Sequence, residues 1–165
     1  MFFYAKLDKP IQESYVFHRG GGLQEGTEIE SVGSTMAVRF KTKENESVLT
    51  KIGLSYTSAS NAKLNFESEA QDKSFEEAQQ KANEIWNEKL SRINVSGGLK
   101  DDKIKFYTAL YHAILGRGLA SDVNGQYPKH DGGVGQIETD ATGNPIHNHY
   151  NSDAIWGAFW NLTQL

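Results

Sequence analysis

The sequence predicts an α+β chain in which strands come first and helices follow. Apolar and polar residues alternate over residues 36–40 and again over 48–56, which is the period of a strand in a sheet with one covered face. From residue 75 to 93 the apolar residues instead recur every three or four positions, as in an amphipathic helix. A second helical pattern follows from about Asp101.

The strand region is predicted to form part of an antiparallel β-sandwich. The polar segment 43–46 separates the two alternating runs, so we expect these runs to pair with each other. Residues 2–7 and 15–18 are shorter strand candidates, and the three glycines at 20–22 indicate a flexible turn. Several short strands joined by turns are typical of a sandwich.

The helical region begins at about residue 58. Residues 58–65 predict a short helix, and Ser74 with Glu77 has the spacing of a capping box at the start of a longer one. Gly97 and Gly98 end that segment. The next helix has an acidic start near Asp101, which suits the positive end of the helix dipole.

The last fifteen residues, 151–165, predict a helix buried on every side. Asn151 or Ser152 can cap it and Asp153 lies in its first turn, after which the segment is apolar almost all round. No glycine, basic last turn or proline follows to close it. We therefore expect the chain to be a piece of a larger protein.

The intervening residues, 116–150, read as a long loop. Asn124-Gly125 is a strong signal for a tight turn. A loop of this length is unusual inside a compact domain, so we expect it to have a functional role or to dock against other parts of the protein.

Composition narrows the function classes. The formal net charge of the 165 residues is −4 and there is no block of Lys or Arg, so the basic footprint of a nucleic-acid-binding protein is missing. There is no cysteine, which excludes disulfides and thiolate chemistry. Residues 1–9 do not form a signal peptide, and no run approaches the roughly 18 to 20 apolar residues of a membrane span.

Four segments, at residues 51–67, 86–93, 106–112 and 121–127, together resemble glycoside hydrolase family 92, the calcium-dependent exo-acting α-mannosidases. They occur in the family's order and at comparable spacing. The resemblance implies that residues 1–70 are the end of a β-sandwich domain, 71–98 a helical linker and 99–165 the truncated start of an (α/α)6 helical barrel.

One motif departs from the family. Where its members typically carry Trp-Asp-Thr-Phe-Arg on a barrel helix, this chain has Trp156-Gly157-Ala158-Phe159-Trp160. The Trp and Phe are kept, but Gly157 and Trp160 replace the charged residues, so the sugar contacts of those two positions do not carry over. Altered specificity and loss of activity are both compatible with this change.

The resemblance implies that the whole protein hydrolyses terminal α-mannosides in glycans with inversion, uses Ca²⁺, and is periplasmic or secreted. Inversion needs a carboxylic acid and a carboxylate base about 6.5 to 9.5 Å apart, with water between them. In the family these groups and the calcium-contacting residues lie beyond the position of Leu165. No catalytic residue and no metal ligand is therefore assigned in this chain.

Two residues are candidates for substrate binding. Trp156 could stack its indole face on a pyranose ring, although a tryptophan in a buried helix is also ordinary core. Asp153 lies three residues earlier on nearly the same side and could accept from a sugar hydroxyl. At a helix start, however, a carboxylate commonly interacts with the free amides.

Two short motifs could bind metals. His147 and His149, with Asp140 or Glu138, could form a three-ligand site with an open position, but surface loop residues are the favoured reading. The segment 122–125 has the look of part of a calcium loop, yet Pro128 and Lys129 occupy the register where further ligands belong. A tight turn with a structural role is the favoured reading.

Three functions therefore compete. The first is part of an α-mannosidase-like glycoside hydrolase that is inactive by itself, and the second is a β-rich carbohydrate-binding or protein-interaction module with a helical tail. The third is a small metal-dependent hydrolase that uses the histidine loop. A module that stands alone should shelter the last helix against its own strands, at Ile155, Trp156, Phe159, Trp160 and Leu162.

Overall fold

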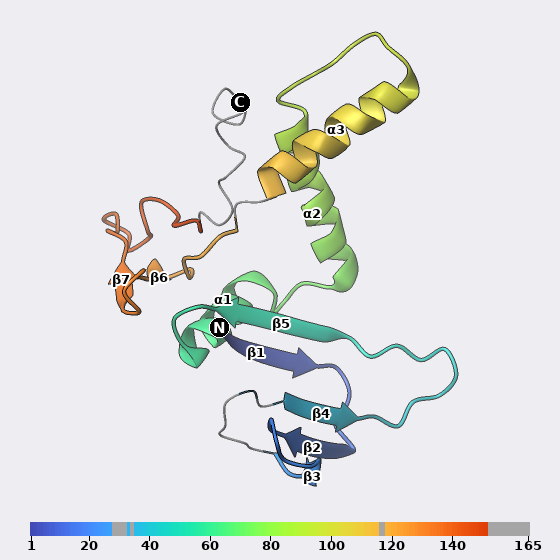
Figure 1. The fold of residues 1–165 in the computed structure, drawn as a ribbon, viewed down its shortest axis with the longest axis vertical. Helices are drawn as coiled ribbons and strands as arrows, with labels where there is room; N and C mark the ends of the chain where they lie inside the picture. The colour runs from blue at the N-terminus through green and yellow to red at the C-terminus, as the bar shows by residue number, and fades with distance from the viewer. Residues whose placement is uncertain (28–32, 34, 116–117, 152–165) are drawn as a thin grey trace. The chain divides into compact units, whose positions relative to one another are not determined.

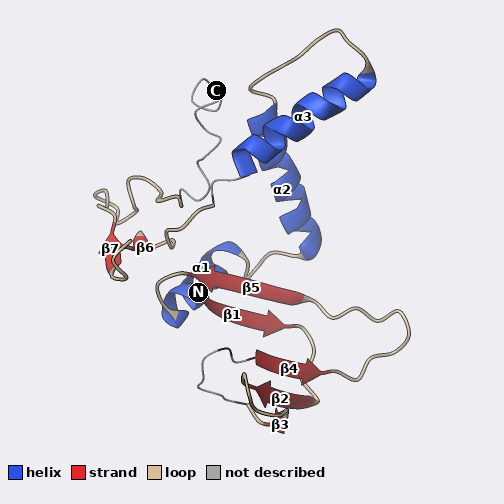
Figure 2. Ribbon diagram, in the orientation of Figure 1, coloured by secondary structure: helices blue, strands red, loops and turns tan. Residues whose placement is uncertain are grey.

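The computed structural model describes residues 1–27, 33, 35–115 and 118–151. Its strands and helices follow the predicted order, with five strands, three helices and two short strands along this part of the chain (Figures 1 and 2). The chain divides into two compact units: residues 5–51 form one, and residues 1–4 with 52–165 form the other.

The unit of residues 5–51 is built on a three-stranded sheet. Its order is β3 (Gln24–Glu25), β2 (Glu13–Phe17) and β4 (Thr35–Arg39), and β2 runs antiparallel to both neighbours. The prediction that residues 36–40 pair with residues 48–56 is therefore wrong: β4 pairs with β2, and Glu13 lies opposite Arg39.

Side chains reinforce the pairing of β2 with β4. Arg39 Nη1 donates to Glu13 Oε2 at 2.6 Å, and the Arg39 guanidinium lies 5.7 Å from the centroid of the Tyr15 ring. Tyr15 also donates to Glu13 Oε2, at 2.7 Å, and this hydrogen bond is the main reason that the pKa of Tyr15 is raised. Opposite charges facing each other across two strands help to fix their register.

The polar turn at residues 43–46 is present as predicted. Glu46 N donates to Lys43 O at 3.2 Å, Lys43 N donates to Glu46 Oε2 at 2.8 Å, and Asn45 takes a left-handed φ of 61°. Lys9 forms an ion pair with Glu46, and its hydrogen bond is the largest cause of the lowered pKa of that carboxyl. The turn thus closes on its own side chains and leads on toward β5.

The other unit begins with strands β1 (Phe2–Leu7) and β5 (Thr50–Ser55), which pair with each other, and helix α1 (Ala59–Glu69). Phe66 of α1 is only 2% exposed and its ring lies 5.0 Å from that of Tyr4. Ala62 of the same helix is fully buried. These contacts form the centre of the core on this side of the sheet.

Strand β5 has one covered face, but it is the face of its small residues. Gly53 and Ser55 are buried on the side of α1, whereas Ile52 and Leu54 remain about half exposed in the described part of the chain. A Cβ built on Gly53 would lie 2.3 Å from Ala62 O and 2.6 Å from Phe66 Cβ. The glycine is therefore required because the helix backbone approaches the strand too closely for any side chain.

Helices α2 (Phe75–Leu90) and α3 (Lys100–Leu115) follow, as predicted. Ser74 Oγ accepts from Glu77 N at 3.1 Å, and Glu77 Oε2 accepts from Ser74 N at 2.7 Å, which confirms the capping box. The ring of Trp86 in α2 packs on that of Tyr111 in α3, with centroids 4.5 Å apart. None of the helices in the described residues has the length and apolar character needed to cross a membrane.

Residues 118–151 form a loop that closes on itself. Its ends meet where Leu119 bridges Tyr150, and two short antiparallel strands lie between them, β6 (Gln126–Pro128) and β7 (Val134–Gln136). The segment was predicted to be a loop, and it is one, with a small hairpin that the sequence pattern did not indicate. We call residues 118–151 the closed loop.

We predict that Gly53→Ala destabilises the unit that contains α1 by about 1 to 3 kcal/mol, because the added methyl group must displace helix backbone. Urea-induced unfolding followed by circular dichroism measures this change.

Gly22→Ala is the matched control. A Cβ at Gly22 meets nothing within 4 Å, so this variant should change the unfolding free energy by no more than about 0.5 kcal/mol. Equal effects of the two substitutions would contradict the close contact between β5 and α1.

Candidate functional site

The polar centre of the molecule forms where β5 ends and α1 begins. Ser55 Oγ accepts from Thr57 N at 3.0 Å, which turns the chain out of the strand. Ser58 then caps the helix, because its Oγ accepts from Asn61 N at 3.0 Å. The short segment 55–58 thus places two further hydroxyl groups beside the first turn of α1.

Helix α1 adds two amide side chains to this centre. Asn61 and Asn65 lie one turn apart, on the same face, and are only 6% and 9% exposed. Asn65 Nδ2 donates to Leu54 O at 2.7 Å, which ties the helix to the last part of β5. Buried amides of this kind are stable only when they are hydrogen-bonded.

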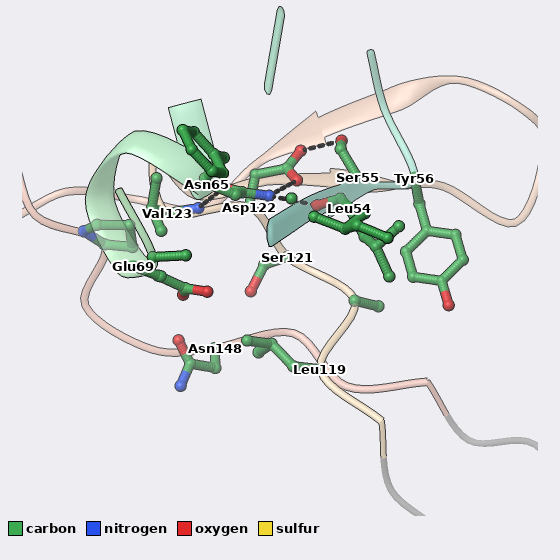
Figure 3. Close-up of a pocket in the computed structure, with 16 residues that line it drawn as sticks. Leu54, Ser55, Tyr56, Asn65, Glu69, Leu119, Ser121, Asp122, Val123 and Asn148 are labelled. Atoms are coloured by element: carbon green, nitrogen blue, oxygen red, sulfur yellow. Dashed lines mark hydrogen bonds between the residues drawn. The ribbon is translucent and has the colours of Figure 1, made fainter. Parts of the chain in front are cut away.

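Asp122 of the closed loop enters between these groups with a carboxylate that is 5% exposed. Its Oδ1 accepts from Asn65 Nδ2 at 2.7 Å. Its Oδ2 accepts from Ser55 Oγ at 3.0 Å and from Asn61 Nδ2 at 3.1 Å, and also from the Thr57 hydroxyl. Figure 3 draws the bonds to Ser55 and Asn65 beside the cleft described below.

The residues after Asp122 complete the network. Val123 N donates to Asn65 Oδ1 at 3.0 Å, and Asn124 Nδ2 donates to Asn61 Oδ1 at 3.0 Å. Asn61 Nδ2 also donates to Gln126 Oε1 at 2.6 Å. We call this set the Asp122 network; its members are Ser55, Thr57, Asn61, Asn65, Asp122, Val123, Asn124 and Gln126.

The carboxylate is therefore held by neutral donors. A buried charge costs several kcal/mol unless hydrogen bonds replace its lost water, and each bond to a charged group contributes about 1.5 to 3 kcal/mol. Asp122 receives four such bonds from side chains. Among the described residues, no buried side-chain nitrogen or oxygen is left without a partner.

The predicted tight turn at Asn124-Gly125 lies inside the network. Gly125 N donates to Asp122 O at 2.8 Å, and Gly125 has a φ of 82°. A Cβ at this position would lie 2.9 Å from Gln136 Nε2 and 2.9 Å from Pro145 Cγ. Only glycine suits both this backbone conformation and this space.

A cleft of about 500 Å³ lies next to the network. Its walls come from residues 52–55 of β5 and the following Tyr56, from the end of α1, and from residues 119–123 with Pro145 and Asn148 (Figure 3). Leu54, Tyr56 and Leu119 contribute apolar surface, and Glu69 and Asn148 contribute polar groups. Such a mixture of a mostly apolar lining with a few polar groups is typical of small-molecule sites.

The predicted substrate-binding residues, Trp156 and Asp153, lie outside the described residues, as do Gly157 and Trp160. The structure therefore does not test these assignments, which stay predictions. The apolar residues of the last predicted helix also lie outside the described residues. Whether the strands of this chain cover that helix is therefore not tested.

The sequence favours surface loop residues over a metal site at His147 and His149. Across the described residues, no group of three or more His, Cys, Asp or Glu side chains could hold a metal ion. The ring of His149 instead stacks on Tyr127, with centroids 4.5 Å apart. Asp140 Oδ1 accepts from Thr142 Oγ1 and from the amides of Thr142 and Asn144, within a local turn.

Those hydrogen bonds explain the electrostatics of Asp140. The bond from the Thr142 hydroxyl, followed by the bonds from backbone amides, holds the pKa of the Asp140 carboxyl below its usual range. The shift therefore reports a turn that is closed by a side chain and needs no metal ion or catalytic role.

Asp122 and its turn do not fit the calcium ion that the family resemblance implies. A Ca²⁺ site needs six to eight oxygen ligands. Both oxygens of Asp122 already accept from neutral donors, and the reading of residues 122–125 as a turn rather than a calcium loop agrees with the geometry. No step in the chemistry of this chain is assigned to calcium.

The sequence reasoning missed the partners of Asp122. The sequence places Ser55 in a predicted strand, Asn61 and Asn65 in a predicted short helix, and all of them with Thr57 in the segment 51–67 that resembles the family, but it indicates no contact with Asp122. The available signal was the pair Asn61 and Asn65, at i and i+4 of a predicted helix. Asparagine is a poor helix former, so two of them on one face indicate that their side chains make tertiary contacts.

We predict that Asp122→Ala lowers the free energy of unfolding of this unit by about 2 to 4 kcal/mol, because four donors, three of them on buried residues, lose an acceptor together. The measurement is urea-induced unfolding of the two proteins under identical conditions.

Asp131→Ala is the control, because it removes the same kind of side chain from an exposed position. Asp131 is exposed and, among the described residues, accepts from Gly133 N in its own turn, so its removal should cost no more than about 0.5 kcal/mol. A loss at Asp122 as small as that at Asp131 would mean that the network does not hold the unit together.

Comparison with known proteins agrees with the sequence resemblance. A model of the glycosyl hydrolase family 92 catalytic domain matches residues 61–165. No curated protein matches the chain. The matched range includes α1 from Asn61 onward and the closed loop, and hence Asn61, Asn65 and Asp122 of the network.

Solved structures share the fold. The family GH92 inverting mannosidase BT2199 from Bacteroides thetaiotaomicron superposes with a TM-score of 0.79 at 23% identity, covering 95% of this chain and 21% of that one. The α-mannosidase BT3965 from the same organism, in complex with mannoimidazole, gives 0.75 at 21% identity, covering 95% and 20%. The family hydrolase ccman5 gives 0.78 at 21% identity, covering 93% and 20%.

This chain thus spans about a fifth of the length of the solved structures it matches. The family model covers well over half of the chain, and the strands followed by three helices match one part of the larger proteins. The chain belongs to glycosyl hydrolase family 92.

Proposed function

We propose that this chain is part of an α-mannosidase-like glycoside hydrolase that removes terminal α-mannosides from glycans with inversion. The observation that carries the proposal is the family match over residues 61–165. It is supported by the likeness to an inverting mannosidase and to an α-mannosidase that bound mannoimidazole. In this proposal residues 1–70 end a β-sandwich domain, 71–98 form a linker and 99–165 begin an (α/α)6 barrel.

The role of the chain within that protein is structural. Asp122 cannot serve as the acid or the base while both of its oxygens accept from neighbouring side chains, since proton transfer requires access to the substrate or to a water molecule. The Asp122 network instead fixes the closed loop against α1 and β5. Trp156 and Asp153 remain proposed sugar contacts beyond this network.

The remaining attributes of the whole protein are proposed on the resemblance alone. They are dependence on Ca²⁺, held by residues other than those described here, and a periplasmic or secreted location.

We expect the 165-residue chain alone to release no mannose from an aryl α-mannoside or from an α-mannose-terminated glycan, because inversion needs two carboxyl groups spaced to hold a water between them. A protein extended through a complete family 92 domain should release mannose, and a chelator should abolish that release. Liberated mannose is measured by a coupled enzymatic assay.

Turnover by the 165-residue chain would overturn the structural role. An extended protein that hydrolyses no α-mannoside but cleaves another glycoside would overturn the proposed substrate and leave the family intact.

The cleft beside β5 favours a second candidate, a carbohydrate-binding module. We expect a monosaccharide such as methyl α-mannoside, if this candidate is right, to shift the NMR signals of Tyr56 and Asn148, which line the cleft. Tyr56→Ala should then weaken binding about tenfold, within the range expected for loss of an aromatic contact.

Tyr150→Ala is the control, because Tyr150 is also exposed but does not line the cleft. Saturating sugar that leaves the signals of Tyr56 and Asn148 unchanged would rule this candidate out and leave the structural role.

A further inference from the structure

We infer that Asn124-Gly125 is a site of self-modification by deamidation, that the Asp122 network holds the reaction off, and that the reaction disables the network once it has occurred. The inference is independent of any glycosidase activity. It starts from a conflict: the turn requires glycine at position 125, and a glycine next to Asn124 makes that asparagine more reactive.

The conflict is visible in the sequence. Asn124 is the only asparagine of the chain that a glycine follows. Gly125 cannot be replaced, because its φ is 82° and a Cβ would lie 2.9 Å from both Gln136 and Pro145. Without a side chain, however, the Gly125 amide nitrogen is unhindered in approaching the preceding side chain.

The reaction needs only water. The Gly125 amide loses its proton to solvent hydroxide, and its nitrogen then attacks Asn124 Cγ. A new N–Cγ bond forms, the Cγ–Nδ2 bond breaks, and Nδ2 leaves as ammonia after taking a proton from water. Addition of water to either carbonyl of the resulting five-membered succinimide opens it to aspartate or isoaspartate, so no bond is oxidised or reduced.

In the folded chain, hydrogen bonds hold all three reacting groups. The nucleophile is blocked because Gly125 N–H donates to Asp122 O at 2.8 Å. The side-chain oxygen Asn124 Oδ1 accepts from Gln126 N at 3.1 Å, and the leaving Nδ2 donates to Asn61 Oδ1 at 3.0 Å. Attack therefore requires these bonds to open, so the rate follows the population of the locally opened state.

The product cannot restore the network. An aspartate at position 124 has no hydrogen to donate to Asn61 Oδ1 and adds a negative charge close to the buried Asp122 carboxylate, whose own partners include Asn61. An isoaspartate also lengthens the backbone of the turn, which shifts β6 relative to the residues that accept its hydrogen bonds. Either product releases the closed loop from α1.

The test is the rate of deamidation of the full chain in mildly alkaline buffer, with and without denaturing urea, measured by peptide mapping that separates the aspartate and isoaspartate products. We expect the rate at Asn124 to be at least about tenfold lower in buffer than in urea. Equal rates in the two conditions would overturn the protection.

Substitutions test whether the Asp122 network is what slows deamidation in the folded chain. Asp122→Asn and Asn61→Ala should each raise the rate in buffer several-fold, under conditions where circular dichroism shows that the helices persist. Ser74→Ala, which removes only the capping box of α2, should leave the rate unchanged. If neither network variant raises the rate, or if Ser74→Ala raises it equally, the assignment is wrong.

The effect of deamidation on the Asp122 network is measured separately. Asn124→Asp reproduces one product and should speed amide hydrogen exchange at Val123, whose N–H donates to Asn65. Unchanged exchange in this variant would show that the network tolerates the product.

Discussion

The fold of the larger unit depends on one buried carboxylate. Asp122 is 5% exposed and lies among neutral donors that come from two separate stretches of the chain, the end of β5 and helix α1. The residues that it joins lie 57 to 67 positions away in the sequence. A charge in such surroundings is stable only when every donor is in place, so the network forms as a whole or not at all.

This constraint explains the local features around it. Gly53 lets the backbone of α1 approach β5 closely enough for Asn65 to reach Leu54 O. Gly125 lets the turn after Asp122 bring Asn124 and Gln126 to Asn61. In this chain the arrangement fixes the closed loop, which would otherwise have few apolar contacts, since Ala120 and Ile137 are its buried apolar residues in the described part.

Local signals in the sequence predicted the local structure. The capping box at Ser74, the period of α2 and α3, and the turns at residues 43–46 and 124–125 depend on neighbours within a few residues, and all are present. The pairing of β4 with β2 and not with β5 is a tertiary choice, which alternation alone does not encode. Alternation also misled about β5, because the side that packs on α1 is chosen by the small size of Gly53 and Ser55.

The residues of the candidate site also divide into those that local sequence predicts and those that depend on tertiary contacts. The turn that holds Asp122 was predictable from Asn124-Gly125, but its contact with Asn61 and Asn65 was not, because two asparagines in a helix indicate a tertiary contact without indicating which segment supplies it. The proposed sugar contacts Trp156 and Asp153 come from the chemistry of an indole ring and a carboxylate one helical turn apart, and both lie outside the described residues.

Native-state hydrogen exchange tests the central claim most directly. If the Asp122 network opens as a unit, the amides of Val123 and Gly125 in the closed loop and of Ala62 in α1 should exchange with opening free energies equal within about 0.5 kcal/mol. Exchange of Val123 and Gly125 at nearly unprotected rates, while Ala62 stays protected, would contradict the account, because the helix would then be stable without the carboxylate that is said to hold it.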